Sequence, residues 1–168
     1  MKIELKNIKI NLTFSEETIM FQADVFVNGK KTAYANNDGR GGCTFYNSYH
    51  APNNDEDLRQ AEAYCKTLPP IRSEELDFEY DMNLEHFIDE LIEAELKKKE
   101  QKKLEKKMAD TIMWGIPNGN CYVQVKFKIP LAKIPTTRLQ EFVDKYKKEF
   151  QEGHKFLNTN LEGLGIKL

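Results

Sequence analysis

The chain has 168 residues, of which 40% are hydrophobic and 31% are charged, and its formal net charge at pH 7 is −2. This length accommodates one domain with a hydrophobic core, and the composition excludes an intrinsically disordered chain. No apolar run is long enough to cross a bilayer, so we expect no membrane partner. The near-neutral net charge argues neither for nor against a nucleic-acid partner.

The first residues and the cysteines bear on the location of the protein. Met1 to Lys6 alternate in charge and lack the apolar core of a signal peptide, so we expect a cytoplasmic protein. Three cysteines and three histidines are scattered without the spacing of a disulfide framework or a zinc site: Cys43, Cys65, Cys121, His50, His86 and His154. We therefore expect reduced thiols, no metal site and no cofactor.

Alternating apolar residues predict antiparallel strands in the first part of the chain. The alternation changes phase near Asn7, which predicts a β-bulge or a break between two short strands. It resumes over residues 21–27, where one parity should face the core: Phe21, Ala23, Val25 and Val27. Asn28-Gly29 is the preferred pair of a type I′ turn, so a return strand should follow over residues 31–35.

Three segments predict helices. The first begins in Asp55-Glu56-Asp57, is capped by the side chain of Asn53 or Asn54, and ends at Pro69-Pro70. The longest covers residues 83–107, with an apolar stripe in its first half and a lysine-rich second half that we expect to be exposed. The last begins at Pro135 and stops at Gly153.

Further alternation completes the predicted fold. Residues 76–82 alternate apolar and acidic side chains, as in an edge strand or an extended segment. Residues 111–116 and 121–127 flank a Pro-Asn-Gly-Asn turn and should form a second hairpin. Together these elements predict an α+β fold, in which an antiparallel sheet built from hairpins is packed by two or three helices, one of them long, in a single domain over residues 1–168.

The glycine-rich loop is the most informative feature of the sequence. Its core, Asn37-Asp38-Gly39-Arg40-Gly41-Gly42, directly follows a predicted strand. Glycine reaches positive φ freely, and successive backbone N–H groups beside an arginine suit an anion. Neither G-x-G-x-x-G nor G-x-x-x-x-G-K-[ST] is present. The loop is therefore interpreted either as an anion-binding nest or as an ordinary long turn after a strand.

Two nearby segments supply the other candidate ligand-binding residues. The first places two carboxylates beside two hydroxyls: Ser15, Glu16, Glu17 and Thr18. Such a cluster suits ribose hydroxyls, a base edge or acid–base chemistry, and it is equally typical of a solvated turn. Tyr46 and Tyr49 follow the glycine-rich loop and are interpreted either as rings that stack on a nucleobase or as core and rim residues.

Four segments in the first third of the chain occur in a distinctive order: Phe14-Ser15-Glu16-Glu17-Thr18, Phe21-Gln22-Ala23, Asn28-Gly29-Lys30-Lys31 and Asn37-Asp38-Gly39-Arg40-Gly41-Gly42. In this order they resemble the N-terminal block of a family of small hypothetical proteins from phages and prophages. This chain departs from that pattern at two positions. The pattern leads us to expect a smaller residue in place of Met20 and a glycine in place of Tyr34. The resemblance carries over no functional residue. It implies a setting of phage–host conflict in the host cytoplasm, where small non-enzymatic binders counter defence.

Two other features keep alternative functions open. Lysines gather between residues 97 and 107 without interleaved aromatic residues, and they indicate either a track for phosphate backbones or a solvated helix. Cys43 and His50 are the only conceivable nucleophile–base pair, and no familiar catalytic motif occurs.

We therefore expect a non-enzymatic binding protein of phage or mobile-element type, with no assigned catalytic residue. Its expected ligand is an anionic, nucleotide-like small molecule at the glycine-rich loop, whose sequestration counters host defence signalling. The alternatives are a protein- or nucleic-acid-binding module that uses the charged long helix, and a small Cys/His hydrolase. Nucleic acid is the less favoured partner, and a homo-oligomer is compatible with the sequence.

Overall fold

The computed structural model describes residues 1–73, 78–117, 119 and 121–168. The chain divides into two compact units, Met1–Lys98 and Lys99–Leu168, and each has a hydrophobic core of its own. The boundary lies within helix α2 (Leu84–Met108), in a lysine-rich stretch where neither proline nor glycine marks a linker. The second core is not anticipated from the sequence. The single domain stays a prediction. In calorimetry, one unfolding transition would support it and two transitions would contradict it.

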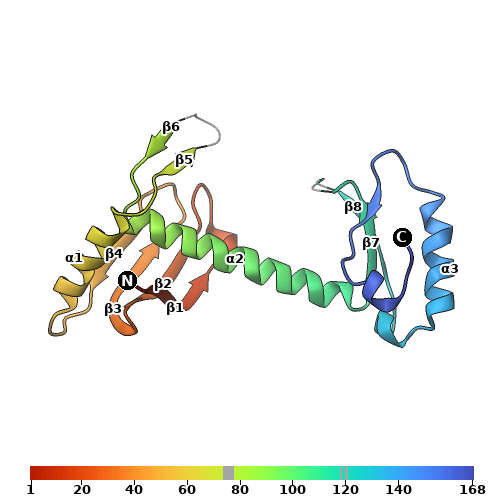
Figure 1. Ribbon diagram of the computed structural model, residues 1–168, viewed down its shortest axis with the longest axis horizontal. Coiled ribbons are helices and arrows are strands. Elements are labelled where there is room, and N and C mark those ends of the chain that lie inside the picture. The colour runs from red at the N-terminus through yellow and green to blue at the C-terminus, as the bar shows by residue number, and fades with distance from the viewer. Residues whose placement is uncertain (74–77, 118, 120) are drawn as a thin grey trace. The chain divides into compact units, whose positions relative to one another are not determined.

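The first unit is built on a four-stranded antiparallel sheet in the order β1-β2-β3-β4 (Figure 1). Its strands are Ile3–Ile10, Phe21–Val27, Lys30–Asn37 and Phe45–Ser48. The pairing of β1 with β2 shifts register between Lys6 and Lys9, where Asn7 has a φ of 53°. Asn28 and Gly29 have φ values of 50° and 85°, as a type I′ turn requires. The predicted irregularity and the predicted hairpin are both confirmed.

Helix α1 (Asn54–Cys65) and the first half of α2 cover one face of this sheet (Figure 1). The predicted inward parity of β2 is confirmed, because its members are at most 6% exposed: Phe21, Ala23, Val25 and Val27. Ala33 and Ala35 on β3 and Ala61 on α1 are each at most 1% exposed. These small side chains let the helix backbone approach the sheet closely, so close packing stabilises this core.

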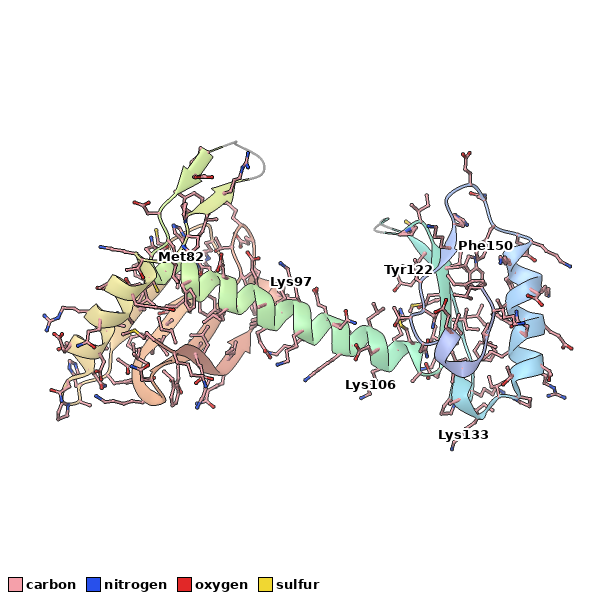
Figure 2. The ribbon with its side chains drawn as sticks, in the orientation of Figure 1. Met82, Lys97, Lys106, Tyr122, Lys133 and Phe150 are labelled. Carbon is pink, nitrogen blue, oxygen red and sulfur yellow. The ribbon has the colours of Figure 1, made fainter. Side chains whose placement is uncertain are left out.

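Helix α2 is amphipathic only in its first half. Its fully buried positions are Leu84, Ile88 and Ile92. Phe87 and Leu91 are half-buried, so their predicted burial is partly right. Every residue from Lys97 to Lys106 is exposed, and Figure 2 labels both ends of this stretch. The predicted exposure of the lysine-rich half is confirmed.

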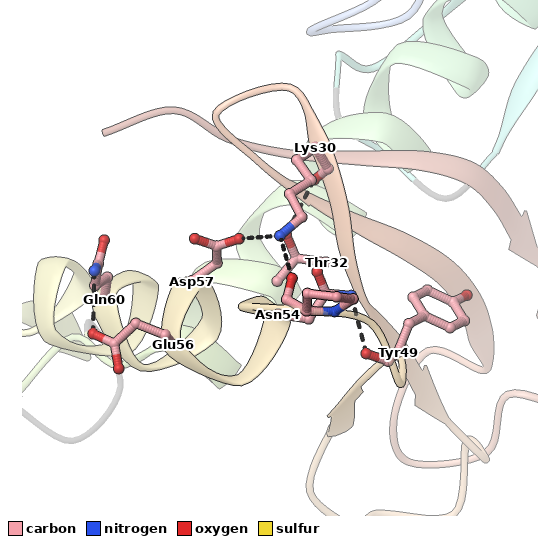
Figure 3. Close-up of polar contacts among 8 residues, drawn as sticks. Lys30, Thr32, Tyr49, Asn54, Glu56, Asp57 and Gln60 are labelled. Atoms are coloured by element: carbon pink, nitrogen blue, oxygen red, sulfur yellow. Dashed lines mark hydrogen bonds and ion pairs between the residues drawn. The ribbon is translucent and has the colours of Figure 1, made fainter.

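Helix α1 does not begin as predicted. Asn53 is its first flanking residue, but its φ is 64° and its side chain forms no capping hydrogen bond, so the predicted side-chain cap is wrong. The helix start is held instead by Lys30, whose Nζ lies 2.7 Å from Asp57 Oδ2, and by Asn54, whose Nδ2 donates to the Tyr49 carbonyl at 3.0 Å (Figure 3). These partners come from other elements, and local sequence does not show them.

Between α1 and α2, strands β5 (Ile71–Ser73) and β6 (Phe78–Tyr80) form a small antiparallel sheet. The predicted extended segment is confirmed for β6, whereas Leu76 lies outside the described residues.

The second unit is a three-stranded antiparallel sheet in the order β8-β7-β9, packed by helix α3. Its elements are β7 (Thr111–Gly115), β8 (Tyr122–Lys126), α3 (Thr136–Lys147) and β9 (Lys155–Phe156). Trp114 is 6% exposed at its centre, with the rings of Tyr146 and Phe156 at centroid distances of 5.0 and 6.2 Å. The predicted second hairpin is confirmed. Helix α3 ends at Lys147, before the predicted stop at Gly153.

Three short 3₁₀ helices complete the described elements: η1 (Leu12–Phe14), η2 (Leu131–Lys133) and η3 (Glu162–Leu164). Across the described ranges, antiparallel sheets and three α-helices, one of them long, make this an α+β fold, as predicted. None of the helices in those ranges combines the length and the apolar character that a membrane crossing requires.

Candidate functional site

The structure brings the glycine-rich loop against the Ser15–Thr18 segment, and Asn37 holds the two together. The Asn37 side chain is 5% exposed. Its Oδ1 accepts hydrogen bonds from Thr18 Oγ1 and from the N–H of Gly39, both at 2.8 Å. Its Nδ2 donates to the Gly42 carbonyl at 3.0 Å and to Thr44 Oγ1 at 3.2 Å. Asn37 is therefore the internal clamp of the loop.

Three of the backbone N–H groups that an anion would use in the glycine-rich loop already donate within this chain. These three consecutive N–H groups donate hydrogen bonds to side-chain oxygens: Gly39 to Asn37 (2.8 Å), Arg40 to Asp38 (3.2 Å) and Gly41 to Thr18 (3.2 Å). An incoming anion would have to break these bonds before it could form its own.

Two glycines of the loop serve close approach within the chain. Gly39 has a φ of +85°, and a Cβ there would lie 2.7 Å from the Phe14 carbonyl oxygen. Gly41 has a φ of +84°, and a Cβ there would collide with the Glu17 carboxylate. Positive φ and missing side chains thus let the loop dock on the Ser15–Thr18 segment.

The cavity beside the loop is acidic. It measures about 420 Å³, and four carboxylates line it: Glu16, Glu17, Asp89 and Glu93. Burial raises the pKa of Asp89, and the nearby carboxylates of Glu85 and Glu93 add to this effect, although Thr44 Oγ1 donates to Asp89 at 2.6 Å. This concentration of negative charge opposes an anionic ligand. Among the described residues, no group of histidine, cysteine and acidic side chains converges to hold a metal ion.

The two candidate tyrosines lie on opposite faces of the β1–β4 sheet. Tyr46 faces the core side, where its hydroxyl donates to Glu62 Oε1 at 2.9 Å. Burial and this carboxylate raise the pKa of Tyr46 to about 12. Tyr49 follows β4 on the other side, where its hydroxyl donates to Asp24 Oδ1 at 2.5 Å. Tyr46 is thus a structural residue of the core boundary, and only Tyr49 lies on the open side.

The open side of the β1–β4 sheet carries a second group of polar and aromatic residues, which we call the outer face. Tyr49 adjoins this face. Strand register places on it the residues that alternate with the buried parity: Glu4, Lys6, Lys9, Gln22, Asp24, Phe26, Lys31, Tyr34, Asn36, Phe45 and Asn47. Tyr34 and Phe45 remain 41% and 64% exposed. In the described part of the first unit, both α-helices pack on the opposite face.

A hollow of about 550 Å³ lies in the middle of the outer face. Its lining combines two tyrosine rings, three amide side chains, a carboxylate and a lysine: Tyr34, Tyr49, Asn7, Gln22, Asn36, Asp24 and Lys9. This volume lies within the usual range for small-molecule sites, about 300–1,000 Å³. The hollow therefore brings together aromatic rings for stacking, amide groups that can hydrogen-bond to the polar edge of a ligand, and a cation.

Asp24 organises one wall of the hollow. Its carboxylate accepts hydrogen bonds from Tyr49 (2.5 Å) and Asn7 (2.7 Å), and Lys31 Nζ lies at 2.9 Å. Burial opposes ionisation of this carboxyl, but the hydrogen bonds outweigh burial and lower the pKa of Asp24 to about 2. Lys31 also lies 4.5 Å above the Tyr49 ring, whose centroid is 5.8 Å from that of Tyr34. The network thus compensates the negative charge of the ionised Asp24 carboxylate and fixes the position of the Tyr49 ring.

Most residues of the outer face are not predicted as binding residues from the sequence. The available signal was an aromatic residue at the polar parity of a strand, as with Tyr34 and Phe45. That parity becomes readable only once the register of β3 and β4 is known.

The pair required by the hydrolase alternative is not assembled. Cys43 and His50 are both exposed, and strand β4 lies between them in the chain. Seven residues of largely extended chain separate two side chains by roughly 20 Å. The structure therefore adds no support for this alternative.

Neither a protein-family model, nor a curated protein, nor a solved structure matches this chain. The resemblance to phage proteins therefore stays a prediction.

Proposed function

We propose that the chain is a non-enzymatic binding protein whose nucleotide-like ligand binds in the hollow of the outer face. The observation that carries this proposal is the meeting of tyrosine rings, amide groups and a lysine in one hollow of about 550 Å³. The phage setting and the sequestration of a host defence signal, which the resemblance implies, belong to the same proposal.

The base and the phosphate of a nucleotide each have a counterpart in the hollow. The exposed ring of Tyr34 offers a π-face for a base, and such stacking is worth about 1–3 kcal/mol per base. The amides of Gln22 and Asn36 supply donors and acceptors for a base edge. Lys9 forms neither an ion pair nor a side-chain hydrogen bond with any residue that the structure describes, so its ammonium group is available to a phosphate.

The same ligand chemistry fits the glycine-rich loop poorly. The N–H groups of Gly39, Arg40 and Gly41 are bonded within the chain, and carboxylates line the neighbouring cavity. We therefore move the proposed anion site from the loop to the outer face.

Calorimetric titration of the full chain with the four ribonucleoside 5′-monophosphates tests this proposal. We expect at least one of them to bind. Tyr34→Ala should then weaken binding about five- to 150-fold, the equivalent of one lost stacking contact. Lys9→Ala should also weaken binding, whereas Lys66→Ala, which removes an exposed lysine from the end of α1, should not.

Two further variants address the competing sites. Arg40→Ala should leave the affinity unchanged, because Arg40 lies on the loop. Simultaneous charge reversal at Lys98, Lys102 and Lys106 should also leave it unchanged if the charged helix takes no part. Loss of binding in Arg40→Ala with retention in Tyr34→Ala would return the site to the loop. No binding of any monophosphate to the unmodified chain would refute the proposal.

A further inference from the structure

We infer, building on the proposed function, that the outer face binds single-stranded nucleic acid, of which the nucleotide in the hollow is one unit. The juxtaposition that supports this is a repeated row of side chains across the four strands, which extends beyond the hollow.

The two rows follow from the strand register. In the first row Lys6 pairs with Asp24, Asp24 with Tyr34, and Tyr34 with Asn47. In the second row Lys9 pairs with Gln22, Gln22 with Asn36, and Asn36 with Phe45. Each row thus begins with a lysine on β1, continues through a polar side chain, and presents one aromatic ring on β3 or β4.

This arrangement suits successive nucleotides. Rows two residues apart along a strand are separated by about 7 Å, so the rings of Tyr34 and Phe45 are diagonal neighbours on one face. Exposed aromatic residues on four-stranded sheets are known to stack two or three bases of a single strand. A strand that crosses the rows would place phosphates toward the lysines of β1 and bases toward the rings of β3 and β4.

Phe45 distinguishes a strand from a single nucleotide. Its side chain is 64% exposed, and it is not among the residues that line the hollow. A mononucleotide in the hollow therefore leaves Phe45 unused, whereas a second base has this ring to stack on. An apolar ring this exposed, beside two rows that carry lysines, matches the base and phosphate pattern of a single strand.

The charge of the outer face also favours a polyanion. Lys6, Lys9 and Lys31 lie on it. Its two carboxylates are already compensated, Asp24 by Lys31 at 2.9 Å and Glu4 by Lys2 at 3.0 Å. Lys6 lies 4.2 Å above the Phe26 ring, so its ammonium group is held at the surface of the sheet.

Fluorescence anisotropy with end-labelled oligouridylates and oligothymidylates of one, two, four and eight nucleotides tests this inference on the full chain. We expect the affinity to rise steeply from one to about four nucleotides. The two series decide whether RNA or DNA is preferred, and binding of either supports the inference. Because each phosphate contact contributes about 0.7 to the slope of log K against log salt for single strands, the double variant Lys6→Ala, Lys9→Ala should flatten that slope by about 1.4.

Phe45→Ala is the decisive variant. It should weaken the longer oligonucleotides about five- to 150-fold while leaving mononucleotide binding unchanged. Phe45→Leu should weaken binding as much as Phe45→Ala does, because it removes the aromatic ring although it keeps a large apolar side chain. The matched control is Phe14→Ala, since Phe14 is also 64% exposed and lies in η1, outside the outer face. Circular dichroism melting establishes that each variant is folded.

The outcomes separate this inference from the proposed function. If one nucleotide binds as tightly as eight and Phe45→Ala changes nothing, the inference is overturned, while the proposed function stands as long as Tyr34→Ala weakens mononucleotide binding. If neither nucleotides nor oligonucleotides bind, both fail. If sedimentation shows a dimer that Phe45→Ala dissociates, the outer face is an interface between copies of the chain, and the inference is overturned.

Discussion

The glycine-rich loop and the outer face use polar residues in opposite ways. In the loop, the Asn37 side chain is buried and its oxygen and nitrogen meet four partners within the chain. On the outer face, Tyr34 and Phe45 are exposed, and Lys9 has no ion pair within the described residues. A group whose hydrogen-bonding capacity is used internally stabilises the fold, whereas an exposed and unsatisfied group is available to a ligand.

This comparison shows why glycine-rich sequence alone is a weak indicator of a site. Gly39 is required because the Phe14 carbonyl lies where its side chain would be, and Gly41 is required because its φ is +84°. The hydrogen bonds of the loop thus hold the Ser15–Thr18 segment against the end of β3. Substitutions in the loop should therefore change stability, and substitutions on the outer face should change binding.

The largest effect is expected for Asn37→Ala. Removing this side chain leaves the Gly39 N–H and the Thr18 hydroxyl proton without their acceptor, and each such loss costs about 1–3 kcal/mol. The free energy of unfolding of the first unit should fall by about 2–4 kcal/mol, as measured by urea denaturation. A loss below about 0.5 kcal/mol, the level typical of surface sites, would show that Asn37 is not a clamp.

A smaller loss is expected for Gly39→Ala. The new methyl group would lie 2.7 Å from the Phe14 carbonyl oxygen on a backbone with a φ of +85°. Such strain costs about 1–3 kcal/mol. Gly42→Ala is the matched control, because its φ is not positive and a Cβ there meets nothing within 4 Å. Equal melting temperatures for the two variants would contradict the close approach at Gly39.

The two sites should also differ in how their carboxyl groups titrate. Side-chain hydrogen bonds hold the pKa of Asp24 at about 2, below its ordinary value of 3.8, whereas burial raises the pKa of Asp89. The contribution of Asp24 to stability is therefore present above pH 4 and is lost as the pH falls through 2, while protonation of Asp89 favours the folded state. Carbon-detected NMR titration should resolve both midpoints. Tyr49→Phe should raise the Asp24 midpoint toward its ordinary value, because it removes the 2.5 Å hydrogen bond.

The smallest change in stability is expected for Tyr34→Ala. Tyr34 is 41% exposed on the outer face, so its removal should alter the free energy of unfolding by no more than about 0.5 kcal/mol. A larger loss in urea denaturation would show that the ring serves packing and would weaken its assignment as a binding residue.

Local pattern was sufficient for much of the fold. The alternation of Phe21 to Val27 and the Asn28-Gly29 pair give the central hairpin because side-chain parity and turn chemistry are local properties. The start of α1 was not predictable in the same way. It depends on Lys30 and Tyr49, which reach Asp57 and Asn54 from other elements.

The candidate site was predictable only in part, for the same physical reason. The sequence brought the Ser15–Thr18 segment and the glycine-rich loop into one hypothesis, and the structure places them together. It did not show that their polar groups bond to one another, because Thr18 and Asn37 are 19 positions apart. Nor did it separate Tyr46 from Tyr49, because the inward parity of β4 is set by its pairing with β3.

The central claim, that the outer face and not the glycine-rich loop receives the ligand, is tested most directly by amide chemical-shift mapping. Uniformly ¹⁵N-labelled chain is titrated with a four-nucleotide oligouridylate or oligothymidylate, whichever binds more tightly. We predict that the largest shifts fall on strands β1 to β4 at Lys9, Gln22, Tyr34, Asn36 and Phe45, with Gly39, Arg40 and Gly41 unmoved. Shifts concentrated at those three loop residues, with the strand amides unchanged, would contradict the account.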